Sequence, residues 1–340
     1  MVDSGDVSLA SLASANTDSG SPASQATLWR SFILRRLVGL VFVLTGLALA
    51  TFLMVRLIPG DPALNIAGLH ASQEQLEAIR HQLGLDAPLL SQLGSFASDL
   101  ARGDLGHSFI THQPVSDLLW QRMGSSVELA AVCLVVVLGV SLPVGILLGA
   151  RTHDGRHRRL EVGVTALSSV FASLPEYLLA TLLALVFAVW LRVLPVAGSE
   201  GWQSLVLPVL AVSLRPIAVL TSLVRAETAN VLSADYIRTA RSKRLPATVI
   251  YARHVFPNVA TAALTIGGMI FAAIIGGAVV VENVFARSGL GTALVSAVLN
   301  RDYPVIQGTV LALGIIVVVV NAVVDILTAV VDPRALNRTG

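Results

Sequence analysis

Charged residues are scarce in this chain of 340 residues. They make up 13% of the sequence, against 54% for hydrophobic residues, whereas about 25% of an average soluble domain is charged. The 23 basic and 21 acidic residues leave a net charge of +2, so no large basic surface is available for nucleic acid. This composition excludes an ordinary water-soluble globule and predicts an all-α integral membrane protein that binds no nucleic acid.

Cysteine and lysine are almost absent. The single cysteine, Cys133, lies in an apolar run, which excludes a disulfide framework and a cysteine-based zinc or iron–sulfur site. The single lysine, Lys243, does not follow the Gly-x-x-x-x-Gly pattern of a phosphate-binding loop. We therefore expect that this chain holds no metal or cofactor and does not hydrolyse ATP by that route.

Long uncharged runs define the candidate membrane spans. A helix needs about 20 apolar residues to cross the roughly 30 Å hydrocarbon core. Three of the runs are interrupted once each, by Glu176, Arg215 and Asp325, and Pro175 can divide the first of these three into a re-entrant pair. We predict six transmembrane helices, over residues 37–55, 129–150, 162–191, 202–224, 255–281 and 303–331.

The distribution of basic residues predicts the orientation of these spans. With a cytoplasmic amino terminus, six spans place 15 basic residues inside and 7 outside, which is the direction of the positive-inside rule. A seventh span would move the cluster from Arg238 to Arg244 to the outside. Both termini are therefore expected in the cytoplasm.

Composition also predicts how the chain is divided. Residues 1–30, rich in Ser and Ala, are expected to form a disordered cytoplasmic tail, and the first span lies within 31–58. Residues 59–124 form an extracytoplasmic region. Residues 125–334 form a core of five further spans with a cytoplasmic loop over 226–256, and residues 335–340 form a second cytoplasmic tail.

Two short helices are predicted in the extracytoplasmic region. Ser72–Leu83 begins with a candidate N-cap serine, followed by Glu and Gln in its first turns. Pro88–Leu100 repeats apolar residues at helical spacing. The region is therefore expected to be structured.

The cytoplasmic loop is polar but has helical spacing. Ser233 is a candidate N-cap for a short helix in which Ile237 and Ala240 share one face. Arg238 and Arg241 lie on another face. From composition alone, this segment is a positive-inside loop anchored to anionic lipid.

The same loop resembles that of a known transporter family. Arg238-Thr239-Ala240 and His254-x-Phe256-Pro257 have the spacing of the loop by which permeases of binding-protein-dependent ABC importers engage their ATPases. The chain is similar over residues 31–335 to the first permease of the dipeptide, oligopeptide and nickel subgroup. The further motifs are Ile58-Pro59-Gly60-Asp61-Pro62, Leu83-Gly84-Leu85-Asp86, Gly103-Asp104-Leu105-Gly106-x-Ser108-Phe109, Leu194-Pro195-Val196-x-Gly198, Gly289-Leu290-Gly291, Asn300-Arg301-Asp302-Tyr303-Pro304-Val305-x-Gln307-Gly308 and Asp332-Pro333-Arg334.

This resemblance implies a type I ABC importer permease fold in the plasma membrane of a bacterium. It implies that the chain is not an enzyme, because ATP and Mg²⁺ are bound by partner ATPases. The implied partners are a second homologous permease, two ATPase subunits or domains, an extracytoplasmic binding protein and membrane lipid. Short peptides are the expected solutes, with nickel chelates or other small peptide-like compounds as the alternative.

The resemblance also implies which residues transmit the ATPase movement. Ile237 and Ala240 are expected to be apolar contacts in a groove of the ATPase. Arg244 stands where the family usually has glycine, which takes a positive φ without steric cost, so we expect the arginine to form this turn differently. The candidate coupling residues are Asp235, Tyr236, Ile237, Arg238, Thr239, Ala240, Lys243, Arg244, Phe256 and Pro257.

Glu176 and Arg215 are candidates for the translocation path. Such charges cost about 2.5–3.5 kcal/mol each at mid-membrane on insertion scales, and helical rise allows the two to meet there. Two hypotheses stay open. The side chains either line the path and meet the termini of a peptide, or form a structural ion pair that hides both charges from lipid.

Other classes of membrane protein fit the sequence less well. A two-aspartate protease needs paired aspartates in its spans, and only Asp325 is present. A haem bundle needs histidines deep in the spans, and none is found there. An ion-gradient-driven secondary transporter accounts for buried charges but not for the cytoplasmic loop and its spacing.

Overall fold

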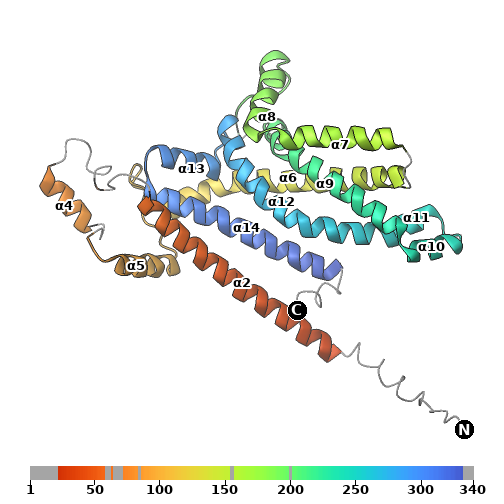
Figure 1. Ribbon diagram of the computed structural model, residues 1–340. Coiled ribbons are helices and arrows are strands. Elements are labelled where there is room, and N and C mark those ends of the chain that lie inside the picture. The colour runs from red at the N-terminus through yellow and green to blue at the C-terminus, as the bar shows by residue number, and fades with distance from the viewer. Residues whose placement is uncertain are drawn as a thin grey trace, which may run out of the picture.

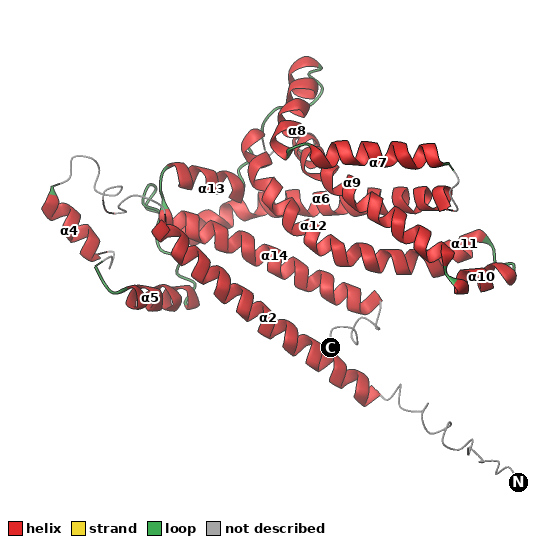
Figure 2. Ribbon diagram, in the orientation of Figure 1, coloured by secondary structure: helices red, strands yellow, loops and turns green. Residues whose placement is uncertain are grey.

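The chain forms a bundle of long helices with a group of short helices at each end, as Figure 1 shows. This structure is a computed structural model, which describes residues 22–57, 63, 72–82, 86–153, 157–198 and 201–331. Within these ranges Figure 2 shows helices joined by short loops, and the β-pairing is an isolated bridge between His107 and Pro114. The predicted all-α fold is confirmed.

Among the described residues, five helices are long and apolar enough to cross a membrane, and a bent helix pair supplies a sixth candidate. This agrees with the prediction of six spans. The helices are α2 (Pro22–Leu57), α6 (Val115–Thr152), α7 (Arg158–Ser173) bent against α8 (Glu176–Leu183) and the π-helix η3 (Ala184–Trp190), α9 (Gln203–Ser233), α12 (Phe256–Val284) and α14 (Tyr303–Val331).

The third span is broken at the predicted proline. α7 ends at Ser173, and Leu174 is extended, with φ −75° and ψ 127°. Proline disfavours the helical conformation in the residue before it and donates no backbone hydrogen bond. Beyond Pro175, α8 and η3 turn by 96° relative to α7, and Figure 1 shows them projecting from the side of the bundle.

Two predicted boundaries differ from the structure. α2 begins at Pro22, inside the segment predicted as a tail over residues 1–30, and residues 1–21 lie outside the described residues. α6 begins at Val115, whereas the core was predicted to begin at residue 125. Helical hydrogen bonds do not require apolar side chains, so each helix continues into polar sequence beyond its apolar run.

The two short helices predicted between residues 72 and 100 lie at one end of the bundle, as Figure 1 shows. In α4 (Gln73–Gln82), the Gln75 N–H donates to Ser72 Oγ at 3.2 Å, and the Ser72 N–H donates to Gln75 Oε1 at 3.0 Å. This reciprocal pair is a capping box. α5 (Leu89–Ala101) follows Pro88, also as predicted.

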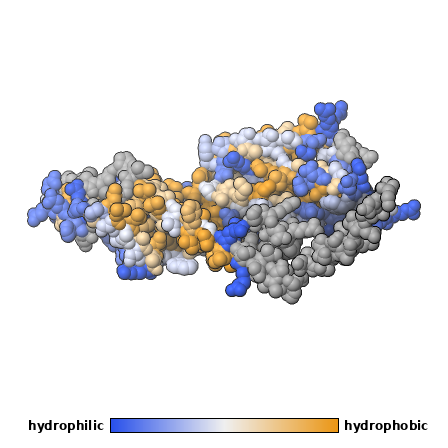
Figure 3. Space-filling model, turned by 60° about the horizontal axis from the view of Figure 1, so that its bottom comes forward, coloured by the Kyte–Doolittle hydropathy of each residue, from blue (hydrophilic) through white to orange (hydrophobic). Residues whose placement is uncertain are grey.

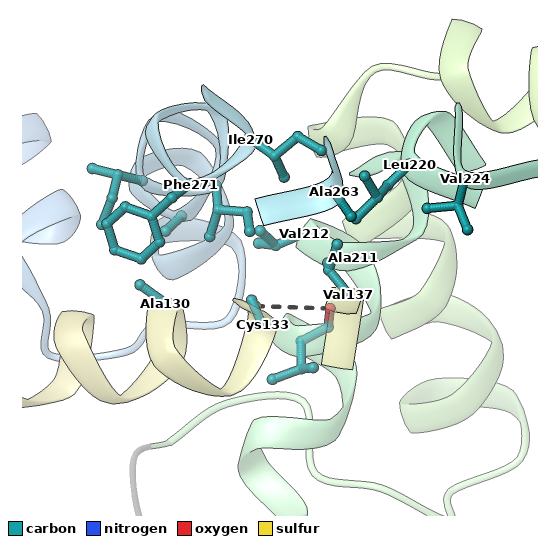
Figure 4. Packing of buried hydrophobic residues seen from close by; sticks show 14 of the residues in the cluster. Ala130, Cys133, Val137, Ala211, Val212, Leu220, Val224, Ala263, Ile270 and Phe271 are labelled. Atoms are coloured by element: carbon teal, nitrogen blue, oxygen red, sulfur yellow. Dashed lines mark hydrogen bonds between the residues drawn. The ribbon is translucent and has the colours of Figure 1, made fainter. Parts of the chain in front are cut away.

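The hydrophobic core lies where α6, α9 and α12 meet, as Figure 4 shows. Gly145 and Gly149 of α6 allow α9 to approach closely. A Cβ atom on Gly149 would lie 2.6 Å from Thr228 Cβ and 2.7 Å from the Arg225 carbonyl oxygen. Lipid is as apolar as the helices, so the hydrophobic effect does not drive membrane helices together. Small residues let the backbones approach closely, and van der Waals contact then stabilises the pair.

Hydrophobic side chains also cover much of the outside of the bundle. Figure 3 shows them over the middle of one face, with hydrophilic residues toward both ends. On α2 the exposed residues include Leu34, Val38 and Phe42. This pattern suits a protein surrounded by lipid along its middle.

A buried polar network joins the outer ends of α6 and α12 to α13 (Leu290–Leu299). Glu282 is 1% exposed and accepts hydrogen bonds from Ser126 Oγ at 2.6 Å and from the Gly291 N–H at 2.7 Å. Ser126 Oγ in turn accepts a hydrogen bond from the Leu290 N–H at 2.8 Å. The network therefore satisfies the first N–H groups of α13 and fixes its start against the bundle.

Replacing Gly149 with alanine is expected to separate α6 from α9. The new methyl group overlaps Thr228 and the Arg225 carbonyl group, so we expect a loss of about 1–3 kcal/mol in stability. Thermal unfolding of the purified protein in detergent measures this loss. Gly139→Ala in the same helix is the matched control, because a Cβ atom there meets nothing within 4 Å. Equal behaviour of the two variants would contradict this account of the contact.

Replacing Glu282 with glutamine is expected to loosen α13. The amide group keeps the shape of the carboxylate but turns one acceptor into a donor, which leaves a buried N–H or hydroxyl group unpaired and costs about 1–3 kcal/mol. Faster hydrogen exchange at Leu290 and Gly291 is the measurement. Glu77→Gln, on the exposed face of α4, is the control. Unchanged exchange in the Glu282 variant would show that the network does not hold this helix.

Candidate coupling surface and intramembrane charges

Two short helices connect α9 to α12 at one end of the bundle. They are α10 (Asp235–Ser242) and α11 (Ala247–Ile250), and the π-helix η4 (Tyr251–Val255) continues α11 into α12. Figure 1 shows them at the end opposite α4 and α5. The chain from 226 to 256 is therefore helical over most of its length and continuous with two membrane spans.

The start of α10 differs from the prediction. Ser233 was expected to cap this helix, but it is the last residue of α9, and its Oγ donates to the Ala229 carbonyl oxygen at 3.0 Å. Ala234 is the residue before α10 and is extended, with φ −70° and ψ 147°. The serine hydroxyl has an acceptor one turn earlier in its own helix, so it does not serve α10.

The two apolar residues of α10 face inward. Ile237 is 0% exposed and Ala240 is 5% exposed, and both belong to the hydrophobic cluster that includes Leu232, Ile250 and Val255. Their predicted role as contacts in a groove of an ATPase stays a prediction. Burial against their own chain fixes α10 to the end of α9 and to the cluster that contains Ile250 of α11 and Val255 of η4.

The outward face of this segment is mostly basic. Asp235, Arg238 and Thr239 are exposed, and Asp235 lies 3.6 Å from Arg238 in an ion pair open to solvent. Such a pair contributes little to stability. Among the remaining candidate coupling residues, Pro257 is half-buried, and the exposed ones are Tyr236, Lys243, Arg244 and Phe256.

Arg244 adopts the left-handed conformation that suits glycine, with φ 55°. The Leu245 N–H donates to the Ala240 carbonyl oxygen at 3.3 Å, and the Arg244 N–H donates to that of Arg241 at 2.9 Å. These two bonds form a Schellman motif that ends α10. The expectation that arginine forms this turn differently is therefore wrong. The motif satisfies the last carbonyl groups, which offsets the steric cost of a left-handed arginine.

An aromatic contact connects α10 to η4, the segment before α12. The ring centroids of Tyr236 and His254 are 6.4 Å apart. Burial raises the pKa of the Tyr236 phenol, and the Glu227 carboxylate raises it further, so this group stays protonated. His254 belongs to η4, which lies just before Pro257. Proline donates no hydrogen bond to the carbonyl group four residues earlier, and a wider turn forms there.

Glu176 and Arg215 lie near each other but do not form a closed pair. Glu176 is half-buried and its carboxylate fills the space beside Gly277 of α12. Arg215 of α9 is exposed and is an electrostatic neighbour of Glu176. Among the described residues, no hydrogen bond or ion pair joins the two side chains.

Other charges in the spans form closed contacts. Arg36 of α2 contacts Asp325 of α14 at 2.8 Å, and Arg225 of α9 contacts Glu161 of α7 at 2.8 Å. Each pair connects two helices that pack against each other. These four residues therefore join neighbouring spans.

The sequence analysis missed the roles of Glu282 and Arg287. Glu282 follows the predicted span, and Arg287 was counted among the outside basic residues. The structure buries Arg287, whose Nη2 donates to Glu128 at 3.1 Å and to Ser125 Oγ at 3.2 Å. A signal for Glu282 was present in Gly289-Leu290-Gly291, because a Cβ atom on either glycine would overlap its carboxylate.

Comparisons with known proteins identify the family of this chain. Residues 141–337 match the family described as "Binding-protein-dependent transport system inner membrane component", and residues 29–130 match the N-terminal region of such membrane components. A "Putative peptide transport system permease protein" of Brucella suis is 41% identical over 312 residues, which cover 89% of this chain and 98% of that protein. The glutathione transport system permease protein GsiC of Escherichia coli K12 is 36% identical over 303 residues, with the same coverage.

Solved structures show a similar fold. An inward-facing structure of the MetNI methionine ABC transporter matches with a TM-score of 0.53 and 18% identity, over 63% of this chain and 96% of that chain. This likeness confirms the type I permease fold. The apolar helices and the family matches make the chain a multi-pass inner-membrane transport component, not a catalytic subunit. The chain belongs to the binding-protein-dependent transport system inner membrane component family, the permease subunits of ABC importers.

Proposed function

We propose that this chain forms half of the translocation path of an ATP-driven importer for short peptides or peptide-like solutes. The named solutes of two relatives, peptides and glutathione, support this solute class. A second homologous permease supplies the other half, and an extracytoplasmic protein delivers the solute. Two ATPase subunits bind ATP and Mg²⁺, and this chain binds neither. Nickel chelates are the alternative solute.

The rigid attachment of the basic α10–α11 surface supports this proposal most directly. Ile237 and Ala240 hold α10 to its own chain, so a force applied to its exposed face reaches α9 and α12 together. Arg238, Lys243 and Arg244 present positive charge to a partner. A permease without a nucleotide site needs such a stiff element to receive the movement of an ATPase.

The arrangement of the ends supports the proposed orientation. The start of α2, the end of α14 and the α10–α11 surface lie at one end of the bundle, as Figure 1 shows. We assign this end to the cytoplasm, in agreement with the positive-inside rule. The opposite end, with α4, α5 and α13, then faces the binding protein. An ion-gradient-driven transporter has no need of the basic surface, and the family matches give it no support.

Uptake by the reconstituted transporter tests the function. The chain, its second permease and its ATPases in proteoliposomes, with the binding protein added outside, are expected to accumulate radiolabelled trialanine only when ATP is supplied to the ATPases. Omitting the ATPases is the control. Accumulation by this chain alone under a proton or sodium gradient would contradict the proposal.

Charge reversal at Arg238 and Lys243 is expected to uncouple transport. Both side chains are exposed, so the double change to glutamate leaves folding intact but repels the ATPase, and we expect ATP-dependent uptake to fall at least tenfold. Arg158→Glu at the start of α7, also exposed at this end, is the matched control. Ala240→Asp is expected to unfold α10, because Ala240 is buried. Normal uptake by the double variant would exclude this surface as the contact.

Replacing Arg244 with glycine is expected to stabilise the end of α10. Glycine takes a positive φ without the steric cost that arginine has, about 1 kcal/mol. Thermal unfolding of the assembled transporter in detergent measures the gain. Lys243→Gly is the control, because Lys243 has φ −76° and glycine there only adds chain entropy to the unfolded state. Lower stability of the Arg244 variant than of the control would contradict the argument.

A further inference from the structure

Glu176 and Arg215 belong to membrane-spanning helices and lie away from the ends of the bundle. Glu176 follows the 16 residues of α7, which correspond to about 24 Å of helix from Arg158. Arg215 is about 18 Å along α9 from Gln203 and about 27 Å from Ser233. Arg215 therefore lies well away from both ends of α9, and Glu176 lies in the half of its span farther from Arg158.

Arg215 is exposed on the most buried straight span. In α9, 61% of the most apolar stretch of 18 residues is buried, compared with 44% or less of the corresponding stretch in the other four straight spans. An arginine that faces lipid at this depth costs about 2.5–3.5 kcal/mol on insertion scales. The face of α9 that carries Arg215 therefore lies against water or protein in the assembled transporter.

The open geometry of this pair differs from that of the closed pairs. Arg36–Asp325 and Arg225–Glu161 each close at 2.8 Å, whereas Glu176 and Arg215 form no such contact within the described ranges. A structural ion pair that hides both charges from lipid would be closed and covered. The structure therefore favours the other hypothesis, in which both groups remain available to a solute.

Gly277 sets the position of the carboxylate. The Glu176 side chain occupies the space that any side chain at residue 277 would need. The carboxylate consequently lies against α12, and Arg215 of α9 is exposed and interacts with it electrostatically. The two charges thus come from different helices, and α8 packs against both α9 and α12.

We propose that Arg215 and Glu176 form a site on the translocation path that selects solutes with a free carboxylate and a free amino group. The planar guanidinium group of Arg215 binds a carboxylate through two parallel hydrogen bonds, and Glu176 accepts hydrogen bonds from an ammonium group. A short peptide carries both groups at its termini. This inference rests on the proposed importer function and assigns part of its selectivity to the permease.

Thiol labelling tests whether the two residues face the path. Cys133, the only cysteine of the chain, is buried, so the unchanged protein gives the background. Arg215→Cys and Glu176→Cys in the assembled transporter are expected to react with a charged methanethiosulfonate reagent at least tenfold faster than Phe42→Cys. Phe42 is the lipid-facing control, on α2 and 79% exposed. Reaction of Arg215→Cys no faster than the control would overturn the proposal.

Uptake of modified peptides tests the selectivity. Trialanine and its C-terminal amide are first shown to bind to the binding protein, and their uptake by the transporter is then compared. Arg215→Gln is expected to lower the ratio of trialanine to amide uptake at least tenfold, while Arg36→Gln, from a closed pair, leaves it unchanged. An unchanged ratio in Arg215→Gln would overturn the proposal. Failure of the unchanged transporter to take up trialanine that its binding protein binds would refute the proposed peptide solute instead, and the labelling result would still report on the path.

Discussion

The constraint that governs this structure is that lipid offers no hydrogen-bond partner. Backbone groups within the membrane must therefore be satisfied inside the protein, which is why the described spans are helices. The same constraint applies to side chains. Glu282 accepts hydrogen bonds from Ser126 and Gly291, and Arg36 and Asp325 contact each other between α2 and α14. Each of these polar groups connects two elements, so satisfying it also holds the bundle together.

Arg215 is an exception, because it forms no closed ion pair in the part of the chain that the structure describes, unlike Arg36 and Arg225. Closed pairs such as Arg225–Glu161 provide each charge with its own partner inside the chain. Arg215 has no such partner among the described residues and is exposed on a span that is otherwise largely buried. A charge that costs free energy in lipid and is not paired implies a polar surrounding supplied by the assembly. The cost of inserting an unpaired arginine therefore supports the proposed position of Arg215 on the path of the solute.

Close packing explains how the end of the bundle with α10 and α11 can act on the rest of it. Glycines in α6 bring its backbone against α9, and α9 also packs on α12. The short helix α10 follows α9 and is connected to α12 through α11 and η4, and Ile237 and Ala240 fix it to the hydrophobic cluster that these segments share. Tightly packed helices move as units instead of deforming continuously. The network around Glu282 fixes the other end of α12 to α6 and α13 in a similar way.

The sequence by itself determined the spans, the possible break at Pro175, the N-cap at Ser72 and the family. These follow from local hydropathy, from the missing N–H of proline and from motif spacing, which need no knowledge of neighbours. Only the tertiary structure decided which face of α10 is outward, because Ile237 and Ala240 are equally suited to a partner and to their own chain. It also showed that Arg244 takes a left-handed turn, through local hydrogen bonds to Ala240 and Arg241. That Glu176 and Arg215 stay open was decided by the packing of separate helices.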